Sequence, residues 1–302
     1  MHALRLGFRP IIQRAHGVGV PIGVLRLAVD GGARLLRLDR HVRVEPETAA
    51  PVPGEWLRSD DSVENTALLY LHGGAYVFCS PRTHRVITSR LALDSGLPVF
   101  VPKYRLAPEH PFPAAIDDAI DAYRWLLEHG IPAGRIVVAG DSAGGHLAAT
   151  LAVEVCRLGL PSPAGIALFS PWADLTCELS IEWDRECRDP YIVPALGRRF
   201  GLLYAGEHDF DDPRLGLLKC NTSGLPPFLI QAGGSDALRS DAEHLAEVLI
   251  EIGVTCELQI WPGQMHVFQA LHKVVPEARA AIQVTARFAR TVIGAEPASA
   301  AA

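Results

Sequence analysis

The chain has 302 residues, a formal net charge of −6 and 49% hydrophobic residues. The length fits one large α/β domain with insertions, and the acidic balance argues against a nucleic-acid partner. No apolar run is long enough to span a bilayer, and Arg5, Arg9 and Arg14 interrupt the apolar stretch at the N-terminus. We therefore expect no stable membrane insertion, no secretory leader and a cytoplasmic location.

The N-terminal region differs in charge from the rest of the chain. Residues 1–43 contain eight arginines, no lysine and only two acidic residues. Residues 1–40 are predicted to be helical, because five residues fall on one face at helical spacing: Val24, Leu27, Gly31, Leu35 and Leu38. We interpret this region as a cap helix with a solvated basic face. The alternative is an arm that rests on a membrane surface, as an interfacial lipase would require.

Strands and helices alternate along most of the chain. Early strands are expected within residues 41–58, followed by strands at 67–71, 98–102, 135–139, 165–169, 228–232 and 256–261. Helices are expected at 82–95, 113–129, 144–158, 239–252 and about 276–293. This alternation is typical of an α/β fold with a mainly parallel central sheet and helices on both faces.

The segment 172–224 interrupts the alternation. It is rich in tryptophan, proline and charged residues and contains no obvious strand. An excursion of this length between sheet strands is usually functional or forms a subdomain. We therefore expect a single domain over residues 1–302, with a cap subdomain built from about 1–42 and about 172–222.

The most informative motif is Gly140-Asp141-Ser142-Ala143-Gly144. It follows a short apolar strand and precedes a helix of small residues, which is the context that a G-x-S-x-G motif needs to form a nucleophile elbow. The glycines matter because the turn leaves little room for Cβ atoms. Ser142 is thus the candidate nucleophile. The alternative is a serine in an ordinary strand-to-helix loop.

A serine hydroxyl needs a base to take its proton, and the base is usually a histidine oriented by a carboxylate. Asp236 and His266 each follow a predicted strand by a few residues, inside loops that contain glycine. Such loops lie at the carboxyl edge of a parallel sheet, as Ser142 does. The sequence therefore predicts a triad of Ser142, Asp236 and His266.

Less favoured assignments exist for both triad partners. Asp236 would also suit the N-cap of the next helix. Asp241 is the rival carboxylate, but it lies within that helix. His272 lies farther from the end of the last strand, and His244 lies in the middle of a helix.

The glycine-rich stretch His72-Gly73-Gly74-Ala75 follows the strand 67–71. Hydrolysis of an ester needs N–H donors aimed at the oxyanion, and these normally come from such a loop and from the residue after the nucleophile. We expect the N–H groups of Gly73, Gly74 and Ala143 to serve, with that of Ala75 as a further donor. The His72 side chain is expected to organise this loop, and Asp141 to orient the elbow by hydrogen bonding.

The sequence contains no recognisable metal site. The six cysteines, at positions 79, 156, 177, 187, 220 and 256, form no C-x-x-C pair and fit a reducing compartment. Residues 207–212 are rich in acidic and histidine side chains, but we interpret them as a solvated loop. No metal and no cofactor are expected.

Several motifs in the same order carry a family resemblance. They are residues 72–76, 104–115, 140–145, 170–172, 223–227, 236–239 and 265–268. On these, the chain resembles the hormone-sensitive-lipase-like bacterial carboxylesterases of the α/β-hydrolase superfamily, which are marked by HGGG and GDSAGG motifs. The resemblance implies an α/β-hydrolase fold with a helical cap. It also implies hydrolysis of short- to medium-chain acyl esters without a cofactor.

Two features depart from the family pattern. Ala75 replaces the third glycine of the HGGG motif, which keeps the backbone N–H but narrows the space beside it. The acid region reads Asp236-Ala237-Leu238, where the family more often has Asp-Pro-Leu.

Other functions stay open. An amide or lactone hydrolase of the arylacetamide-deacetylase kind would use the same triad. A non-catalytic small-molecule sensor, as in the similar plant gibberellin receptors, would lack the catalytic histidine, whereas His266 is present here. The expected partner is a small-molecule ester, and the sequence also allows a homodimer.

Overall fold

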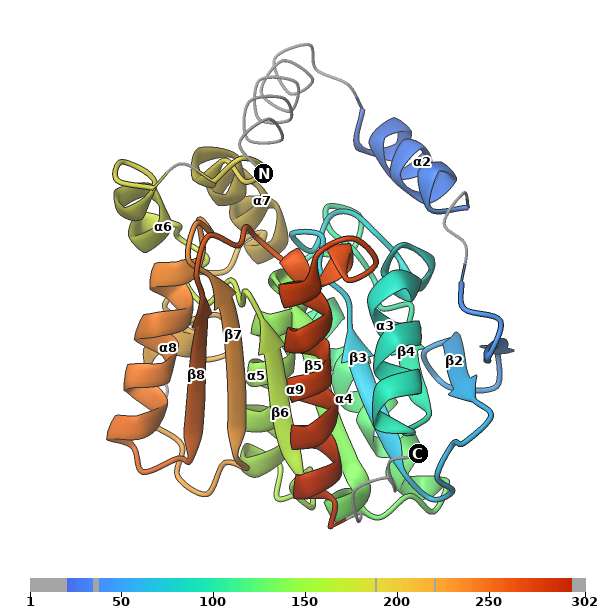
Figure 1. Ribbon diagram of the computed structural model, residues 1–302. Coiled ribbons are helices and arrows are strands. Elements are labelled where there is room, and N and C mark those ends of the chain that lie inside the picture. Colours follow the sequence, from blue (N-terminus) through green and yellow to red (C-terminus); the bar gives the residue numbers. More distant parts are fainter. Residues whose placement is uncertain (1–20, 35–37, 188, 220, 295–302) are drawn as a thin grey trace.

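The centre of the molecule is an eight-stranded sheet in the order β1-β2-β4-β3-β5-β6-β7-β8 (Figure 1). The computed structural model describes residues 21–34, 38–187, 189–219 and 221–294. The strands are β1 Val42–Glu47, β2 Gly54–Ser59, β3 Ala67–Leu71, β4 Val99–Pro102, β5 Ile136–Asp141, β6 Gly165–Phe169, β7 Phe228–Gly233 and β8 Cys256–Trp261. Every predicted strand is present, and the predicted ends from residue 67 onward agree to within two residues.

The direction of the strands positions the functional loops. β1 pairs with β2 and β2 with β4 in antiparallel fashion, whereas all pairings from β4 to β8 are parallel. Loops that follow β3, β5, β7 and β8 therefore emerge at the same edge of the sheet. These are the loops in which the sequence places the candidate oxyanion donors, nucleophile, acid and base.

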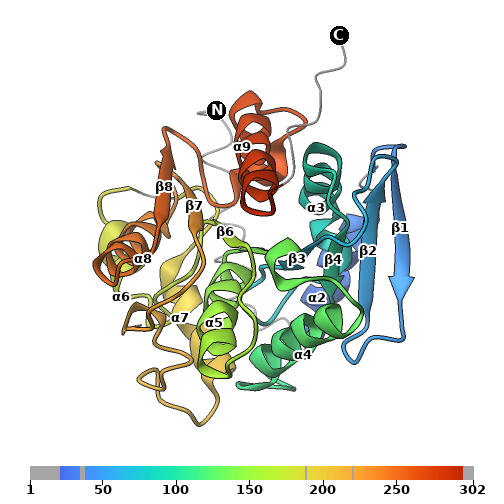
Figure 2. The ribbon, with the colours of Figure 1, turned by 90° about the horizontal axis from the view of Figure 1, so that it is seen from below.

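Helices cover both faces of the sheet (Figure 2). They are α3 Pro81–Ser95 and α9 Pro276–Val292 on one face, and α4 Ala114–Glu128, α5 Ala143–Arg157 and α8 Arg239–Glu251 on the other. Each face has its own apolar core, with Leu91 and Ile282 in one core and Ile116 and Leu147 in the other. Coverage on both faces explains why the inner strands β3, β4, β5 and β6 consist mostly of continuous apolar residues.

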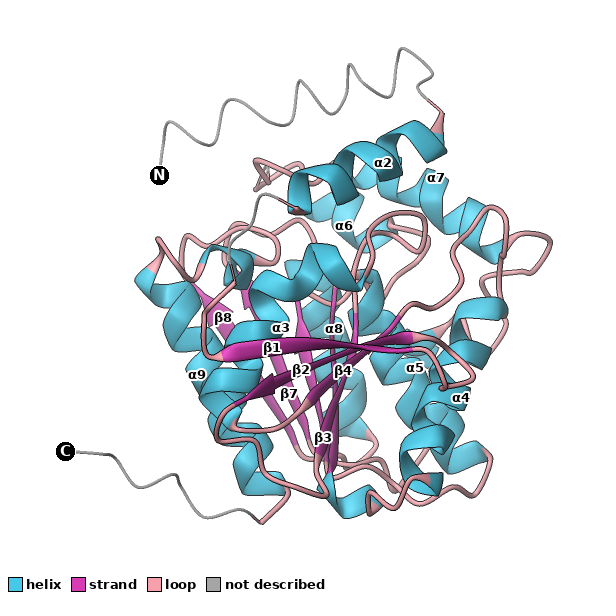
Figure 3. Ribbon diagram, turned by 90° about the vertical axis from the view of Figure 1, so that its right-hand side faces the viewer, coloured by secondary structure: helices cyan, strands magenta, loops and turns pink. Residues whose placement is uncertain are grey.

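Three helices lie beyond the carboxyl edge of the parallel strands, namely α2 Ile22–Ala33, α6 Glu178–Trp183 and α7 Pro194–Ala205 (Figure 3). The helices α6 and α7 belong to the excursion 172–224, whose described residues form no strand, as predicted. Short 3-10 helices occur at Ala133–Arg135, Leu217–Lys219 and Phe268–Leu271.

The predicted N-terminal helical region does not extend to residue 40. The helix α2 ends at Ala33, directly after Gly31 and Gly32, and residues 38–40 are not helical. Glycine is a poor helix former, which explains this end. Val24 and Leu27 of the predicted apolar face are 53% and 75% exposed. Residues 1–20 and Leu35, also part of this prediction, lie outside the described residues.

Within the described ranges, none of the helices combines the length and hydrophobicity that crossing a bilayer requires.

Candidate active site

Ser142 stands at the sharp turn between β5 and α5. Its backbone angles, φ 53° and ψ −121°, fall in a region that residues with a side chain rarely adopt. The turn depends on Gly144, because a Cβ at that position would overlap the carbonyl oxygens of Leu71 and His72 at the end of β3. The close approach of α5 to β3 thus leaves Ser142 at the wall of a cavity, next to the loop that follows β3.

His266 and Asp236 form a buried pair. The Nδ1 atom of His266 lies 3.0 Å from Oδ1 of Asp236, and the two side chains are 3% and 0% exposed. Burial opposes ionisation of both, but their mutual attraction prevails. It holds the pKa of Asp236 below its ordinary value and raises the pKa of His266. An ionised Asp236 only accepts hydrogen bonds, so Nδ1–H donates, and Nε2 becomes the basic atom of the neutral ring.

The rival residues make other contacts. Asp241 is buried and accepts the backbone N–H of Asp174 at 2.9 Å, and burial raises its pKa well above its ordinary value. The Nε2 atom of His272 lies 2.9 Å from the carbonyl oxygen of Val86, to which it donates. His244 pairs with Glu247 on α8. The structure therefore brings Asp236, and none of these three, to His266.

The loop after β3 supplies N–H groups near Ser142, but Gly73 differs from the expectation. Its N–H donates to Oδ1 of Asp141 at 3.1 Å, and it does not line the cavity. The buried carboxylate of Asp141 needs hydrogen-bond donors, which explains why the N–H of Gly73 binds Asp141 and is not left for a substrate. Gly74 and Ala75 do line the cavity, with φ values of 118° and 54°. Ala143 begins α5, where the first N–H groups have no partner within the helix.

Asp141 connects the elbow to the loop after β3. Besides the N–H of Gly73, its carboxylate accepts the Tyr70 hydroxyl at 2.7 Å and pairs with Nε2 of His84 at 3.1 Å. Burial opposes the charge on Asp141, but His84 holds the pKa of this carboxyl below its ordinary value. The orienting role predicted for Asp141 thus has a definite set of partners.

His72 is buried inside the same loop. Its Nδ1 donates to the carbonyl oxygen of Gly73 at 2.8 Å, and its ring stacks on Tyr104 with centroids 4.3 Å apart. Burial lowers the pKa of His72 to about 3, so the ring is neutral at pH 7. These contacts suit a residue that shapes the loop.

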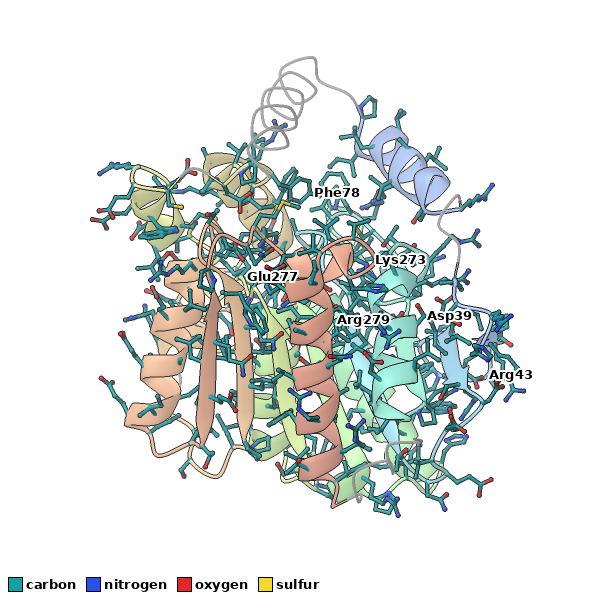
Figure 4. All side chains as sticks on the ribbon, viewed as in Figure 1. Asp39, Arg43, Phe78, Lys273, Glu277 and Arg279 are labelled. Atoms are coloured by element: carbon teal, nitrogen blue, oxygen red, sulfur yellow. The ribbon has the colours of Figure 1, made fainter. Side chains whose placement is uncertain are left out.

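A cavity of about 600 Å³ joins these parts. Ser142 and His266 line it, and most of the remaining lining is apolar and includes Leu25 of α2 and Trp172. Phe78, labelled in Figure 4, also lines the cavity and packs edge-on against Phe200 of α7, with ring centroids 5.1 Å apart. The serine and the histidine therefore face a space suited to an apolar substrate.

Two ionisable residues of the site were not predicted from the sequence. His84 lies in the first turn of α3 and pairs with Asp141. Asp189 lies between α6 and α7 and accepts the backbone N–H of His266 at 3.2 Å. The closeness of His84 to the loop 72–75 along the chain was an available signal, whereas nothing near Asp189 pointed to the active site.

Among residues that the structure describes, no group of three or more histidine, cysteine or acidic side chains is arranged to hold a metal ion. In the stretch 207–212, Asp209 accepts the backbone N–H of Asp211 at 3.0 Å, as in an ordinary turn.

Comparison with known proteins shows to which family the chain is similar. A family model of the α/β-hydrolase fold matches residues 68–270. An acetyl-hydrolase from Streptomyces hygroscopicus is 40% identical over 247 residues, which cover 82% of each chain.

Solved structures agree with this. An esterase from the bacterial hormone-sensitive lipase family superposes with a TM-score of 0.87 at 34% identity, over 96% of this chain and all of the other. The structure of EstE5 soaked with p-nitrophenyl butyrate gives a TM-score of 0.86 at 36% identity, over 91% and 92% of the two chains. The chain therefore belongs to the α/β-hydrolase family, within its hormone-sensitive-lipase-like branch of carboxylesterases.

Proposed function

We propose that Ser142, His266 and Asp236 hydrolyse acyl esters through a covalent acyl-enzyme. The observation that carries this proposal is the buried His266–Asp236 pair, 3.0 Å apart, on the same cavity as the elbow serine. In this arrangement Nε2 of His266 takes the proton of the Ser142 hydroxyl as its oxygen attacks the ester carbonyl. Asp236 stabilises the imidazolium that forms.

The oxyanion of the tetrahedral intermediate requires N–H donors. We assign these to Gly74, Ala75 and Ala143, since the N–H of Gly73 is engaged by Asp141. Collapse of the intermediate expels the alcohol, which receives its proton from His266. The same histidine then activates water against the acyl-enzyme, which releases the carboxylic acid and restores the free serine.

The preferred substrates are short- to medium-chain acyl esters. The apolar lining of the cavity supports an acyl or alcohol group without charge. One similar protein is described as an acetyl-hydrolase, and the crystal of another, EstE5, was soaked with p-nitrophenyl butyrate; both descriptions point to short acyl groups. Ala75 adds a methyl group to this wall, which favours slender acyl chains.

The test is hydrolysis of p-nitrophenyl esters from acetate to laurate by the wild type and by Ser142→Ala. We expect turnover with a maximum at a short or medium chain, and a loss of roughly a thousandfold or more in Ser142→Ala. Matched p-nitroanilides separate an esterase from an amidase. Folded wild-type protein that leaves every ester intact, or that cleaves anilides faster than the esters, would contradict the proposal.

We also propose that α2, α6 and α7 belong to a cap over a single domain, as their position beyond the sheet edge supports. A cytoplasmic location is supported by the cysteines at 79, 177, 187 and 256, none of which is in a disulfide. Cell fractionation tests the location. The homodimer stays a prediction, which light scattering of the purified protein would test.

A further inference from the structure

Asp189 is a fully buried carboxylate that the proposed mechanism does not use. It lies in the excursion between α6 and α7 and is 0% exposed. Burying a charge of this kind is costly unless several donors satisfy it. The donors that surround Asp189 therefore indicate what the residue is for.

Four backbone N–H groups from three segments converge on this carboxylate. Its Oδ1 accepts the N–H groups of Tyr191 at 2.7 Å and Ile192 at 2.8 Å, within its own loop. Its Oδ2 accepts the N–H groups of Ala237 at 3.1 Å and His266 at 3.2 Å. Ala237 directly follows the acid Asp236, and His266 is the base. One oxygen atom thus joins the two loops that must stay in register for the pair to form.

Two further residues of the excursion bind the acid loop, which follows β7 and carries Asp236. The indole Nε1 of Trp183 donates to the carbonyl oxygen of Asp236 at 2.9 Å. The Sγ atom of Cys187 lies 3.8 Å from the carbonyl oxygen of Gly234 and donates to it. The excursion therefore binds both carbonyl oxygens and an N–H group of the acid loop. Several hydrogen bonds of both kinds indicate a fixed attachment between the two segments.

We propose that Asp189 is a positioning residue. Its carboxylate fixes the backbones of the acid loop and of the base loop, which follows β8 and carries His266, so that His266 and Asp236 meet in the reactive geometry. Through Tyr191 and Ile192, which line the cavity, the same carboxylate links the pair to the wall of the substrate pocket. The inference rests on the proposed triad and deepens it, because it assigns part of the active-site geometry to the excursion.

The charge of Asp189 also acts on His266. Burial and the neighbouring Asp236 raise the pKa of Asp189, while the proton on His266 lowers it. Among the residues that the structure describes, the carboxylates of Asp236, Asp189 and Asp141 act on the His266 ring. Although burial opposes the imidazolium, these carboxylates raise the pKa of His266. Removing the charge of Asp189 should therefore move the acid limb of the pH profile to lower pH.

The test compares Asp189→Asn with Asp174→Asn. An asparagine at 189 keeps the size but turns one acceptor oxygen into an NH₂ group, which faces two N–H donors. Asp174 is a matched control, because the hydrogen bonds that its carboxylate accepts come from within the excursion, from the N–H groups of Thr176 at 2.9 Å and Leu179 at 3.1 Å and from the Thr176 hydroxyl. The readouts are kcat and KM for p-nitrophenyl butyrate, the pH profile of kcat/KM and thermal unfolding.

We expect Asp189→Asn to lower kcat by roughly ten- to a hundredfold, as small displacements of reacting groups do, and to shift the acid limb to lower pH. Asp174→Asn should keep the wild-type kcat and leave the acid limb of the pH profile where it is in the wild type. Asp189→Glu separates position from charge: we expect it to lose kcat while the acid limb stays in place. If Asp189→Asn does not fold, the kcat of Asp189→Glu still tests the inference.

A wild-type kcat in folded Asp189→Asn or Asp189→Glu would overturn the inference. So would an equal loss in Asp174→Asn, because the effect would then be general to the excursion. A proton NMR spectrum gives a readout that does not depend on turnover, namely the low-field signal of the His266 Nδ1–H. Its shift in Asp189→Asn supports the inference even if Ser142 proves not to be the nucleophile. An unchanged signal contradicts it.

Discussion

At the scale of single residues, His266 is the group whose ionisation controls the proposed reaction. The base must be neutral to take the proton of Ser142. Burial opposes the charged ring, but the surrounding carboxylates raise the pKa of His266 above its ordinary value. The ring therefore stays protonated, and inactive as a base, up to a higher pH than a free histidine.

We expect kcat/KM to fall with decreasing pH through a midpoint above about 6.5, the ordinary value for histidine. The measurement is a pH profile with a soluble p-nitrophenyl ester, together with tryptophan fluorescence at each pH to show that the fold persists. A midpoint below that value, with the fold intact, would mean that a different group limits the rate.

Gly144 is a residue of the elbow at which the backbone leaves no room for a side chain. A Cβ there would overlap the backbone oxygens of Leu71 and His72, and backbone cannot move aside as a flexible side chain can. We expect Gly144→Ala to lower the free energy of unfolding by about 1–3 kcal/mol or more, the usual cost of overpacking. Chemical denaturation measures this cost.

Gly134→Ala is the matched control, because a Cβ at Gly134 meets nothing within 4 Å. Its free energy of unfolding should stay within about 0.5 kcal/mol of the wild type. Equal stability of the two variants would show that the contact between α5 and the end of β3 is looser than the structure indicates.

At the scale of elements, α2 is attached to the rest of the molecule mainly by polar contacts, besides the packing of Ile22 against the apolar core. None of its residues is buried. Arg26 donates from Nε to the carbonyl oxygen of Val77 at 2.7 Å and from Nη2 to that of Ala107 at 2.6 Å, and it also pairs with Glu109. Leu25 and Val29 of the same helix line the cavity. Arg26 thus helps to position part of the pocket wall, together with Asp30 of α2, which accepts the Ser80 hydroxyl at 2.6 Å.

We expect Arg26→Ala to raise KM for p-nitrophenyl esters by about three- to tenfold and to change kcat less, because α2 lines the cavity and contributes no group to the proposed triad. Hydrogen exchange over residues 21–34 should become faster. Arg34→Ala, on an exposed arginine at the end of the same helix, controls for the loss of charge. A KM equal to that of the wild type would mean that α2 does not contribute to binding.

At the scale of the whole molecule, the proposed chemistry needs only side chains and backbone of this chain. In the part of the chain that the structure describes, no cluster suited to a metal ion occurs. We expect EDTA to leave both ester hydrolysis and the thermal unfolding midpoint unchanged. Activity that is lost on chelation and restored by a divalent cation would require a metal in the mechanism.

The whole molecule also shows how far patterns in the sequence reach. From residue 67 onward, the positions of the strands and of the helices outside the excursion 172–224 were predicted closely, because apolar runs and helical spacing are local properties. The positions of α6 and α7 within the excursion were not predicted. The positions of Ser142, Asp236 and His266 followed from parallel strands that end at one edge. The prediction that the helix continues to residue 40 was wrong, because α2 ends at Ala33. The periodic apolar pattern on which the prediction rested continues past Gly31 and Gly32.

The sequence by itself determined the α/β fold, the family and the candidate nucleophile, acid and base, because each depends on local pattern or motif. Only the tertiary structure decided which N–H groups of the loop 72–75 remain for a substrate, since Asp141 takes that of Gly73. It alone revealed Asp189, which lies 77 residues from His266 in the chain. Hydrogen bonds between distant segments depend on how loops pack, and no local pattern encodes that packing.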